Sequence, residues 1–529
     1  MLFKCLAFAT AALLAAGVAL GASAPPASTS NVPLSTLQDL SAPTPDQGNG
    51  IPTAQSGSDF NLPQIGTAGG DVVTPQQEYE IGLQVINELR DAGLILDDPL
   101  LQQYIQDLGK QLSSHSDNPQ LNFGFYVIDD DDINATTLPG GFIVVNSGML
   151  LLTDTEDELA GVMAHEIGHV TQRHLSRQVE DQQDRSFINI ATMLAAVLAA
   201  TRTNDPDVAM GALATAQGAI IQHQINYTRG DESEADRVGM ATLARAGFQP
   251  KGMVDFFGKV HAAYSSLNGL DKVPEFLLDH PLDLTRMADL ENRAEQLSVP
   301  ERPESRSYAL MKARLQSMQN NDTADKMLTY FKSGIESSKG WDQVAMRYGL
   351  ALTYQKALDY PDAIALMQDL VKQYDDVIPF RIGLADAEMH AGRIPDAINT
   401  YASALRLFPD STPLILSYAG DLVDAGKSGN AVDLLLPLTS ARRGGPDALR
   451  LLAKAYDKKG DSADSHYYMS EYYMANGLAS AAVDQLRIAL ATPGINTVQR
   501  QRYSARLHRV EEAAKEARQE QREQKQQPP

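Results

Sequence analysis

The five residues from His165 to His169 read His-Glu-Ile-Gly-His and carry the clearest chemical signal in this 529-residue chain. On a helix, residues four apart lie on one face about one turn apart, so the two imidazoles can bind one metal ion. Glu166, next to the first imidazole, would then lie where it can accept a proton from a water that the metal activates. The pattern predicts a zinc site that hydrolyses amide bonds, with His165 and His169 as ligands and Glu166 as base.

A third ligand must be a histidine or a carboxylate, because the only cysteine is Cys5, close to the N-terminus. The segment Glu232-Ser233-Glu234-Ala235-Asp236 offers several acids. Glu232 and Asp236 are four apart and share a helical face, and Glu232 has the longer reach. Glu232 is therefore either the third ligand or an ordinary surface acid. Asp236 could bond a ligand histidine from behind or assist proton transfer, whereas Glu234 is expected to be solvated.

Four further polar residues are weaker candidates. His174 lies five residues after His169, off the ligand face, and is expected to be packed or solvated. His280 lies in a break between helical stretches, from which it could reach the metal, displace the water and hold the enzyme inactive. Tyr227 or Arg229 could stabilise an oxyanion, and the sequence does not choose between them.

Apolar periodicity predicts the elements that must position these residues. A helix capped by Thr153 to Thr155 is expected to begin near Glu156 and to run past His174. Helices are also expected from Thr74-Pro75 onward and over 99–112, and strands over 121–128 and 142–145. The strand after Gly141 is either an exposed edge that pairs with an extended substrate or a strand packed inside its sheet.

The chain changes character after about residue 300, where a period of 34 residues appears. Pro361-Asp362-Ala363-Ile364 recurs as Pro395-Asp396-Ala397-Ile398, and Gly392, Gly426 and Gly460 share the same spacing. The pattern resembles tetratricopeptide repeats over roughly residues 305–492. Such helix pairs stack into a solenoid with an extended concave face that binds proteins. Residues 493–529, rich in Arg, Glu and Gln, are expected to form a charged helix that ends in a disordered tail.

The N-terminus predicts export. Lys4, an apolar run from Leu6 to Leu20 and the small residues after it are typical of a signal peptide over residues 1–24. Cleavage after Ala24 fits the small residues there, but Pro25 would follow directly, so cleavage after Gly21 is an alternative. An uncleaved anchor is the other alternative. Residues 25–72 are expected to be a flexible leader. Beyond the signal, the longest apolar run is 187–200, which favours a buried core helix over a helix at a bilayer surface and predicts no transmembrane segment in the mature chain.

The formal net charge of −23 argues against general nucleic-acid binding, which needs a basic surface. It does not identify a substrate.

The residues 164–170 and 232–236, together with Leu138-Pro139-Gly140-Gly141, resemble the HtpX- and Oma-type zinc peptidases. The resemblance covers about residues 72–300. Thr136 and Thr137 depart from it, because that family more often has bulkier or apolar residues there. These two threonines would change the shape of a pocket but would not change the metal ligands.

The resemblance implies a role for each residue of the candidate site. His165, His169 and Glu232 would bind one zinc ion per chain, Glu166 would be the catalytic base, and Asp236 would be a supporting acid or proton donor. It implies a mainly α-helical chain, in which an α+β zincin-type metallopeptidase domain with a small β-sheet, residues 73–300, precedes the α-solenoid of repeats.

Joined to a signal peptide and repeats, this layout resembles the β-barrel assembly-enhancing proteases of Gram-negative periplasms. The implied function is a periplasmic zinc endopeptidase, at the periphery of the outer membrane, that cleaves misfolded or misassembled envelope proteins. A chaperone-like role in outer-membrane β-barrel assembly is implied as well, with the assembly machinery bound through the repeats. The alternative is a scaffold or chaperone factor with a latent or structural zinc site. The intact Glu166 favours the enzyme, because a structural site needs no base.

Overall fold

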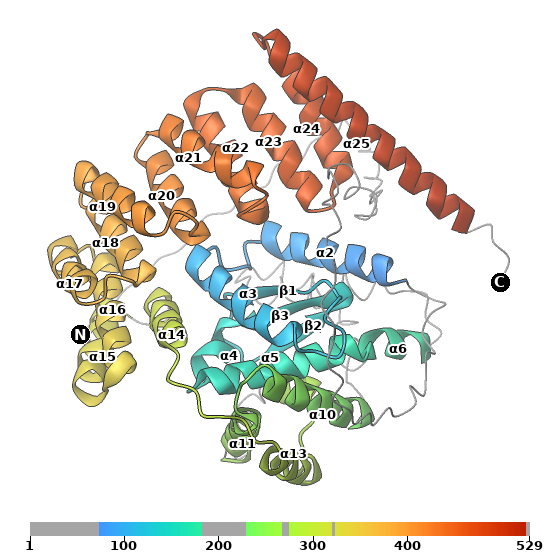
Figure 1. The fold of residues 1–529 in the computed structure, drawn as a ribbon, viewed down its shortest axis with the longest axis vertical. Coiled ribbons are helices and arrows are strands. Elements are labelled where there is room, and N and C mark those ends of the chain that lie inside the picture. The colour runs from blue at the N-terminus through green and yellow to red at the C-terminus, as the bar shows by residue number, and fades with distance from the viewer. Residues whose placement is uncertain (1–73, 182–228, 267–274, 320–322, 525–529) are drawn as a thin grey trace, which may run out of the picture. The chain divides into compact units, whose positions relative to one another are not determined.

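The computed structural model describes residues 74–181, 229–266, 275–319 and 323–524 (Figure 1). The predicted signal peptide, leader, apolar helix over 187–200 and oxyanion candidate Tyr227 lie outside these residues. No helix in the described ranges is long and apolar enough to cross a membrane.

A small three-stranded sheet forms the centre of the N-terminal part. Its strands, in chain order, are β1 (Gly124–Ile128), β2 (Ala135–Leu138) and β3 (Phe142–Asn146). They lie in the order β1-β3-β2, with β3 parallel to β1 and antiparallel to β2. The 3-10 turn η1 (Pro139–Gly141) joins β2 to β3, and Gly140 and Gly141 both have positive φ there, which favours glycine.

The central position of β3 decides between the two alternatives for this strand. All five of its residues are buried, so the strand after Gly141 is packed inside its sheet and is not an exposed edge. Alternate side chains pack on opposite faces, with Phe142 and Val144 in one hydrophobic cluster and Ile143 and Val145 in another. The edge that lies near the His-Glu-Ile-Gly-His motif is instead β2, a strand that the sequence pattern did not predict.

Helices enclose this sheet on both faces (Figure 1). One face packs against α2, which Thr74 caps as expected, and the other packs against α3 and α5. The helices of this part are α2 (Pro75–Asp91), α3 (Pro99–Ser113), α4 (Ser147–Leu152), α5 (Glu156–Thr171), α6 (His174–Asp181), α10 (Arg229–Arg245), α11 (Pro250–Ser266), α12 (Glu275–Asp279) and α13 (Leu284–Gln296).

The helix that carries the His-Glu-Ile-Gly-His motif ends earlier than predicted. Instead of one helix running past His174, α5 ends at Thr171 and α6 begins at His174. Arg173 between them has φ 53°, a left-handed conformation that an α-helix cannot continue. The break turns the chain, so His174 no longer follows the helical register of α5.

Two glycines let α10 approach α5 very closely. A Cβ atom on Gly239 would lie 2.7 Å from the carbonyl oxygen of Ala164, and one on Gly168 would lie 2.8 Å from that of Ala235. Because both contacts are with backbone, neither helix can relieve them by moving a side chain. The small residues thus fix the separation at which α10 faces the motif.

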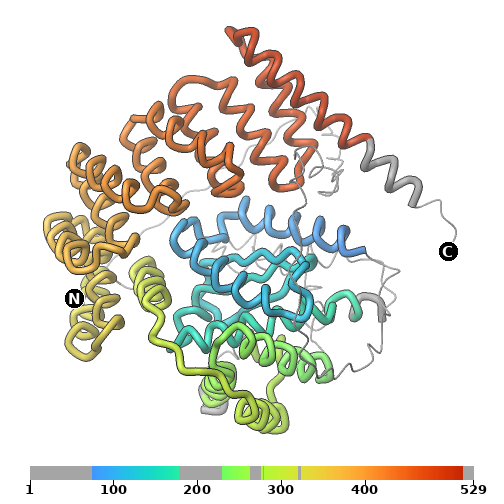
Figure 2. The backbone as a smooth tube through the Cα atoms, in the orientation of Figure 1, coloured from blue at the N-terminus to red at the C-terminus, as the bar shows by residue number. Residues whose placement is uncertain are grey.

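Residues 306–319 and 323–491 form consecutive antiparallel helices, which Figure 2 traces along the backbone. The repeated Pro-Asp-Ala segments begin α17 and α19, and Gly392, Gly426 and Gly460 all have positive φ in the turns. The 34-residue period therefore marks equivalent turns. The helices are α14 (Arg306–Met318), α15 (Ala324–Ser337), α16 (Gly340–Lys356), α17 (Tyr360–Gln373), α18 (Ile378–His390), α19 (Ile394–Leu407), α20 (Thr412–Asp424), α21 (Ser428–Ser440), α22 (Gly445–Lys459), α23 (Ser462–Ala475) and α24 (Ala479–Ala491).

The charged C-terminal segment forms α25 (Thr497–Gln524), whose residues Tyr503, Val510 and Ala513 pack against α23 and α24. It thus covers apolar surface at the end of the repeats. The fold class inferred from the sequence is confirmed, whereas the exact domain boundaries stay a prediction.

Candidate metal centre

His165, His169 and Glu232 converge in the interior, two from α5 and one from α10. The Nε2 atoms of the two histidines lie 3.0 Å apart, and each lies 3.5 Å from a carboxylate oxygen of Glu232. All three side chains are at most 1% exposed. Glu232 is therefore not a surface acid, and its burial beside two imidazoles is what the close contact of α10 with α5 produces.

Glu166, the predicted base, is buried on the same helix and is held by β2. The hydroxyl of Thr137 lies 2.9 Å from its Oε2 atom and 3.0 Å from its main-chain oxygen. Its other oxygen, Oε1, accepts no hydrogen bond within the described ranges. The sequence pointed to Thr137 only as a departure from the family pattern, which gave no sign of this contact.

Asp236 lies behind the first histidine, as predicted, with Oδ1 3.0 Å from Nδ1 of His165. Arg286 of α13 holds this carboxylate with two hydrogen bonds of 2.7 and 2.9 Å, and its Nη1 lies 2.9 Å from Glu232. Arg286 thus ties both acids of α10 in place. No sequence signal pointed to Arg286, because it lies 50 residues after Asp236 and has no fixed spacing from either acid.

His280, just after α12, also reaches the cluster. Its Nδ1 lies 3.1 Å from Glu232 and 3.3 Å from Nε2 of His165, and its Nε2 lies 3.5 Å from Glu166. One candidate ligand atom from each of His165, His169, Glu232 and His280 lies within 4.8 Å of the others. The structure places His280 where the sequence-based hypothesis needs it, although its role stays a proposal.

His174 is packed, one of its two expected outcomes, whereas the expectation for Glu234 is wrong. His174 is only 1% exposed, and its Nδ1 lies 2.9 Å from Nδ1 of His169. Glu234 is not simply solvated, because its carboxylate lies 3.1 Å from Nε2 of His174 and 2.8 Å from Arg177. Neither contact was predicted, because the prediction extended α5 in regular register through Arg173. Arg229, the other oxyanion candidate, is 87% exposed at the start of α10, which does not favour that role.

Burial disfavours the charged form of each acid in the cluster. The charges and hydrogen bonds of neighbouring residues determine which acids stay charged. For Glu166, burial dominates over His280 and His165 and raises the pKa of the carboxyl. For Glu232, burial is outweighed by His280 and His165, which hold the pKa well below its ordinary value. For Asp236, His165 and Arg286 likewise outweigh burial and lower the pKa. Neighbouring carboxyls with pKa values shifted in opposite directions are typical of acid–base chemistry.

The donor set fits a zinc ion. Two imidazole nitrogens and a carboxylate, with nearby groups fixing their orientation, are the ligands that catalytic zinc takes in proteins. Oε1 of Glu166 is a buried acceptor without a hydrogen bond in the described part of the chain, whereas Oε2 of Glu232 lies 2.9 Å from Nη1 of Arg286. A cation beside Oε1 of Glu166 would relieve the cost of burying this atom.

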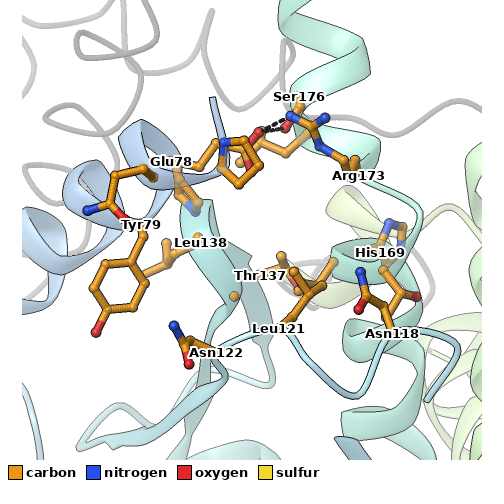
Figure 3. Close-up of a pocket in the computed structure, with 18 of the residues that line it drawn as sticks. Glu78, Tyr79, Asn118, Leu121, Asn122, Thr137, Leu138, His169, Arg173 and Ser176 are labelled. Atoms are coloured by element: carbon orange, nitrogen blue, oxygen red, sulfur yellow. Dashed lines mark hydrogen bonds and ion pairs between the residues drawn. The ribbon is translucent and has the colours of Figure 1, made fainter. Parts of the chain in front are cut away.

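A cavity of about 300 Å³ opens beside this cluster, between β2, α2 and the end of α5. Thr137 and His169 face it from the strand and the helix (Figure 3). At its rim, Arg173 and Ser176 both donate to Glu78, with distances of 2.5 and 2.6 Å. The predicted site is thus next to a space that a substrate segment can enter.

Comparison with known proteins agrees with this geometry. Residues 99–294 match the model of Peptidase family M48, and residues 348–412 match a tetratricopeptide repeat model. The chain is 31% identical over 454 residues to the beta-barrel assembly-enhancing protease of Yersinia pestis, which covers 85% of this chain and 91% of that protein. The chain belongs to the β-barrel assembly-enhancing protease family.

Two further members of this family share shorter alignments. Identity is 37% over 316 residues with the protein of Escherichia coli K12 and 36% over 326 residues with the putative one of Vibrio cholerae. These alignments cover 59% and 62% of this chain but only 62% and 66% of the relatives. The chain thus spans a little under two thirds of each of these two relatives.

Proposed function

We propose that this chain is a zinc-dependent endopeptidase of the periplasm. The observation that carries the proposal is the buried convergence of His165, His169 and Glu232 beside Glu166. Membership in a family whose relatives are named proteases supports it, as does the match to Peptidase family M48.

Each residue of the cluster has a role in this proposal. Nε2 of His165, Nε2 of His169 and the carboxylate of Glu232 would hold the zinc ion, which when bound polarises water and the scissile carbonyl. Glu166 accepts a proton at Oε1 from the attacking water and later donates it to the leaving amine. Asp236 orients His165 and keeps its proton on Nδ1.

The substrate backbone is proposed to bind along β2. This strand hydrogen-bonds β3 on one side, and in the described residues no strand pairs with its other side. Thr137 of β2 touches the base, so a chain lying beside this strand would run past Glu166. Main-chain pairing accepts many sequences, which suits an enzyme that cleaves misfolded chains.

We extend the proposal to substrates and location. The relatives' printed name refers to β-barrel assembly, and the relatives are Gram-negative bacteria. The proposed substrates are therefore misfolded or misassembled envelope proteins. The repeats would contact outer-membrane β-barrel precursors or their assembly machinery and add a chaperone-like role.

The resting enzyme is proposed to be latched by His280. Its imidazole lies against Glu166, His165 and Glu232, where it would compete with water. A His280→Ala variant should cleave casein faster than wild type while it keeps its zinc. Unchanged basal cleavage would count against the latch.

A scaffold with a latent metal site is the second candidate, and the position of His280 is the observation in its favour. The variant Glu166→Gln separates the two candidates. In the enzyme it keeps one zinc ion per chain and loses casein cleavage by about 100-fold or more, the usual contribution of a general base. Zinc content is measured by atomic emission and cleavage with and without a chelator. Wild type that binds no zinc, or a variant that cleaves as fast as wild type, contradicts the proposal.

A further inference from the structure

His169 has a second partner inside the protein besides the candidate metal cluster. Its Nε2 faces His165 and Glu232, whereas its Nδ1 lies 2.9 Å from Nδ1 of His174. His174 is the first residue of α6, beyond the break at Arg173. The two rings meet nearly at right angles, with an interplanar angle of 77°.

Hydrogen bonding fixes how the protons must be shared. A ligand histidine that binds metal through Nε2 keeps its proton on Nδ1. That N–H donates to Nδ1 of His174, which must then be an acceptor. The remaining proton of a neutral His174 lies on Nε2, and this atom is 3.1 Å from the carboxylate of Glu234. Every bond in the series from His169 to Glu234 therefore has one donor and one acceptor.

A salt bridge holds the far end of this series. Arg177 of α6 lies 2.8 Å from Glu234 and 3.3 Å from Asp231, both on α10. His174, Asp231 and Glu234 offer ligand atoms close enough for a second metal ion. The guanidinium already supplies a positive charge there, so we interpret the group as a structural contact between α6 and α10.

We propose that His174, oriented by Glu234, is the positioning residue for His169 and that the docking of α6 on α10 thereby sets the affinity of the metal site. The inference rests on the proposed zinc site. In this proposal His174 bonds the nitrogen of His169 that does not face the metal, as Asp236 does for His165. Because linkage is reciprocal, zinc binding also stabilises α6 in its docked position.

The first experiment measures the zinc dissociation constant of the full chain by competition with a chromophoric chelator. His174→Leu fills the space without an acceptor and should weaken zinc binding about 10- to 100-fold, the usual effect of removing such a partner. His174→Asn, whose Oδ1 takes the place of Nδ1, should recover part of the affinity. Glu234→Gln should give a smaller loss than His174→Leu.

The controls separate positioning from packing. His115→Ala removes an exposed histidine at the end of α3 and should bind zinc like wild type. If His174 only fills space, His174→Leu binds zinc within about twofold of wild type, and the inference is wrong. Glu234 is about one-third exposed, so Glu234→Gln tests the inference even if substitution of the buried His174 prevents folding. Wild type that fails to bind zinc contradicts the proposed function itself, which is a different outcome.

The second experiment measures the reciprocal effect without any activity. Zinc should slow amide hydrogen exchange over residues 174–181 in wild type and should slow it much less in Glu234→Gln. Equal protection of α6 by zinc in both proteins would overturn the linkage.

Discussion

Thr137 donates its hydroxyl hydrogen to Glu166 from β2, so a side chain of the sheet fixes the base on the helix. With Oε2 held in this way, Oε1 is the oxygen left to face the ligand cluster. One hydroxyl can donate one hydrogen, and the main-chain oxygen of Glu166 competes for it. The contact with the carboxylate is strongest when Glu166 is ionised.

Replacing Thr137 with Val removes the hydroxyl and keeps the shape. We expect kcat to fall by about 10-fold or more, since a hydrogen bond to a charged group contributes roughly 1.5–3 kcal/mol. KM and zinc affinity should hardly change, and Thr137→Ser should restore kcat. Steady-state kinetics on a fluorogenic peptide measures the effect. Equal loss in the Ser and Val variants would show that the methyl group matters and the hydroxyl does not.

Arg286 is a buried cation that pairs with both Glu232 and Asp236, and it is 6% exposed. Arg286→Met leaves two buried carboxylates without their guanidinium partner, so we expect a loss of about 3–5 kcal/mol in the free energy of unfolding without zinc. Saturating zinc should recover part of it. Arg293→Met, on the same helix but at the surface, should cost less than about 1 kcal/mol. Urea unfolding measures both, and equal losses would contradict the assignment.

For individual residues, the sequence predicts the contacts that follow from a fixed spacing along one helix. His165, Glu166 and His169 follow from one helical turn, and Asp236 follows from Glu232 by the same rule. Thr137 and Arg286 could not be predicted, because their contacts join elements whose packing the chain order does not state. The contact of His174 with His169 was not predicted because one left-handed residue, Arg173, breaks the register.

Asp421 shows how an element of the repeats responds to pH. Burial of this α20 carboxyl and the charge of Asp386 raise its pKa from 3.8 to about 7, although the hydroxyl of Tyr401 and the imidazole of His390 oppose the shift. The folded chain therefore holds a proton between pH 3.8 and about 7 that the unfolded chain has lost. Its contribution to stability falls as pH rises through this window and is constant above it.

Asp421→Asn removes this titration. We expect the variant to gain stability relative to wild type as pH rises from about 4 to 7, with no further gain above pH 7. Urea unfolding at pH 4.5, 6 and 8 follows the difference. Asp484→Asn, 68% exposed on α24, is the control and should show no such trend. A difference that stays constant with pH would rule out the raised pKa.

Local signals predicted most elements, and long-range pairing explains the misses. Thr74 and Pro75 specify the start of α2, and the 34-residue period specifies the turns of the repeats. The strand β2 has the sequence Ala-Thr-Thr-Leu, which is too short and too weakly alternating to stand out. It forms a strand because it pairs with β3 in the sheet.

The first helix of the repeats is tied directly to the N-terminal part. Arg314 of α14 pairs with Asp98, the N-cap of α3, at 2.6 Å, and Tyr308 donates to the main-chain oxygen of Thr153 at 2.6 Å. Asp98 is 5% exposed, so this ion pair is shielded from solvent. Ligands that stabilise the N-terminal part should therefore also affect α14.

Zinc should raise the stability of the whole chain. At a free concentration 100 times its dissociation constant, we expect a gain of about 2.7 kcal/mol, because zinc binds the folded state and not the unfolded one. Scanning calorimetry should show the unfolding temperature falling when a chelator is added. Glu232→Gln, with the third ligand lost, should show little shift. If the unfolding temperature of wild type does not change when the chelator is added, the proposed metal site is contradicted.

The close packing of Gly239 against the backbone of Ala164 affects how the sequences of homologues should be interpreted. A single extra methyl group there would force α10 away from α5, because the added carbon would meet a carbonyl oxygen at 2.7 Å. Glu232 would then move off the two histidines although every motif residue is still present. A homologue with a larger residue at this position is therefore a candidate pseudoenzyme that motif searches would count as active.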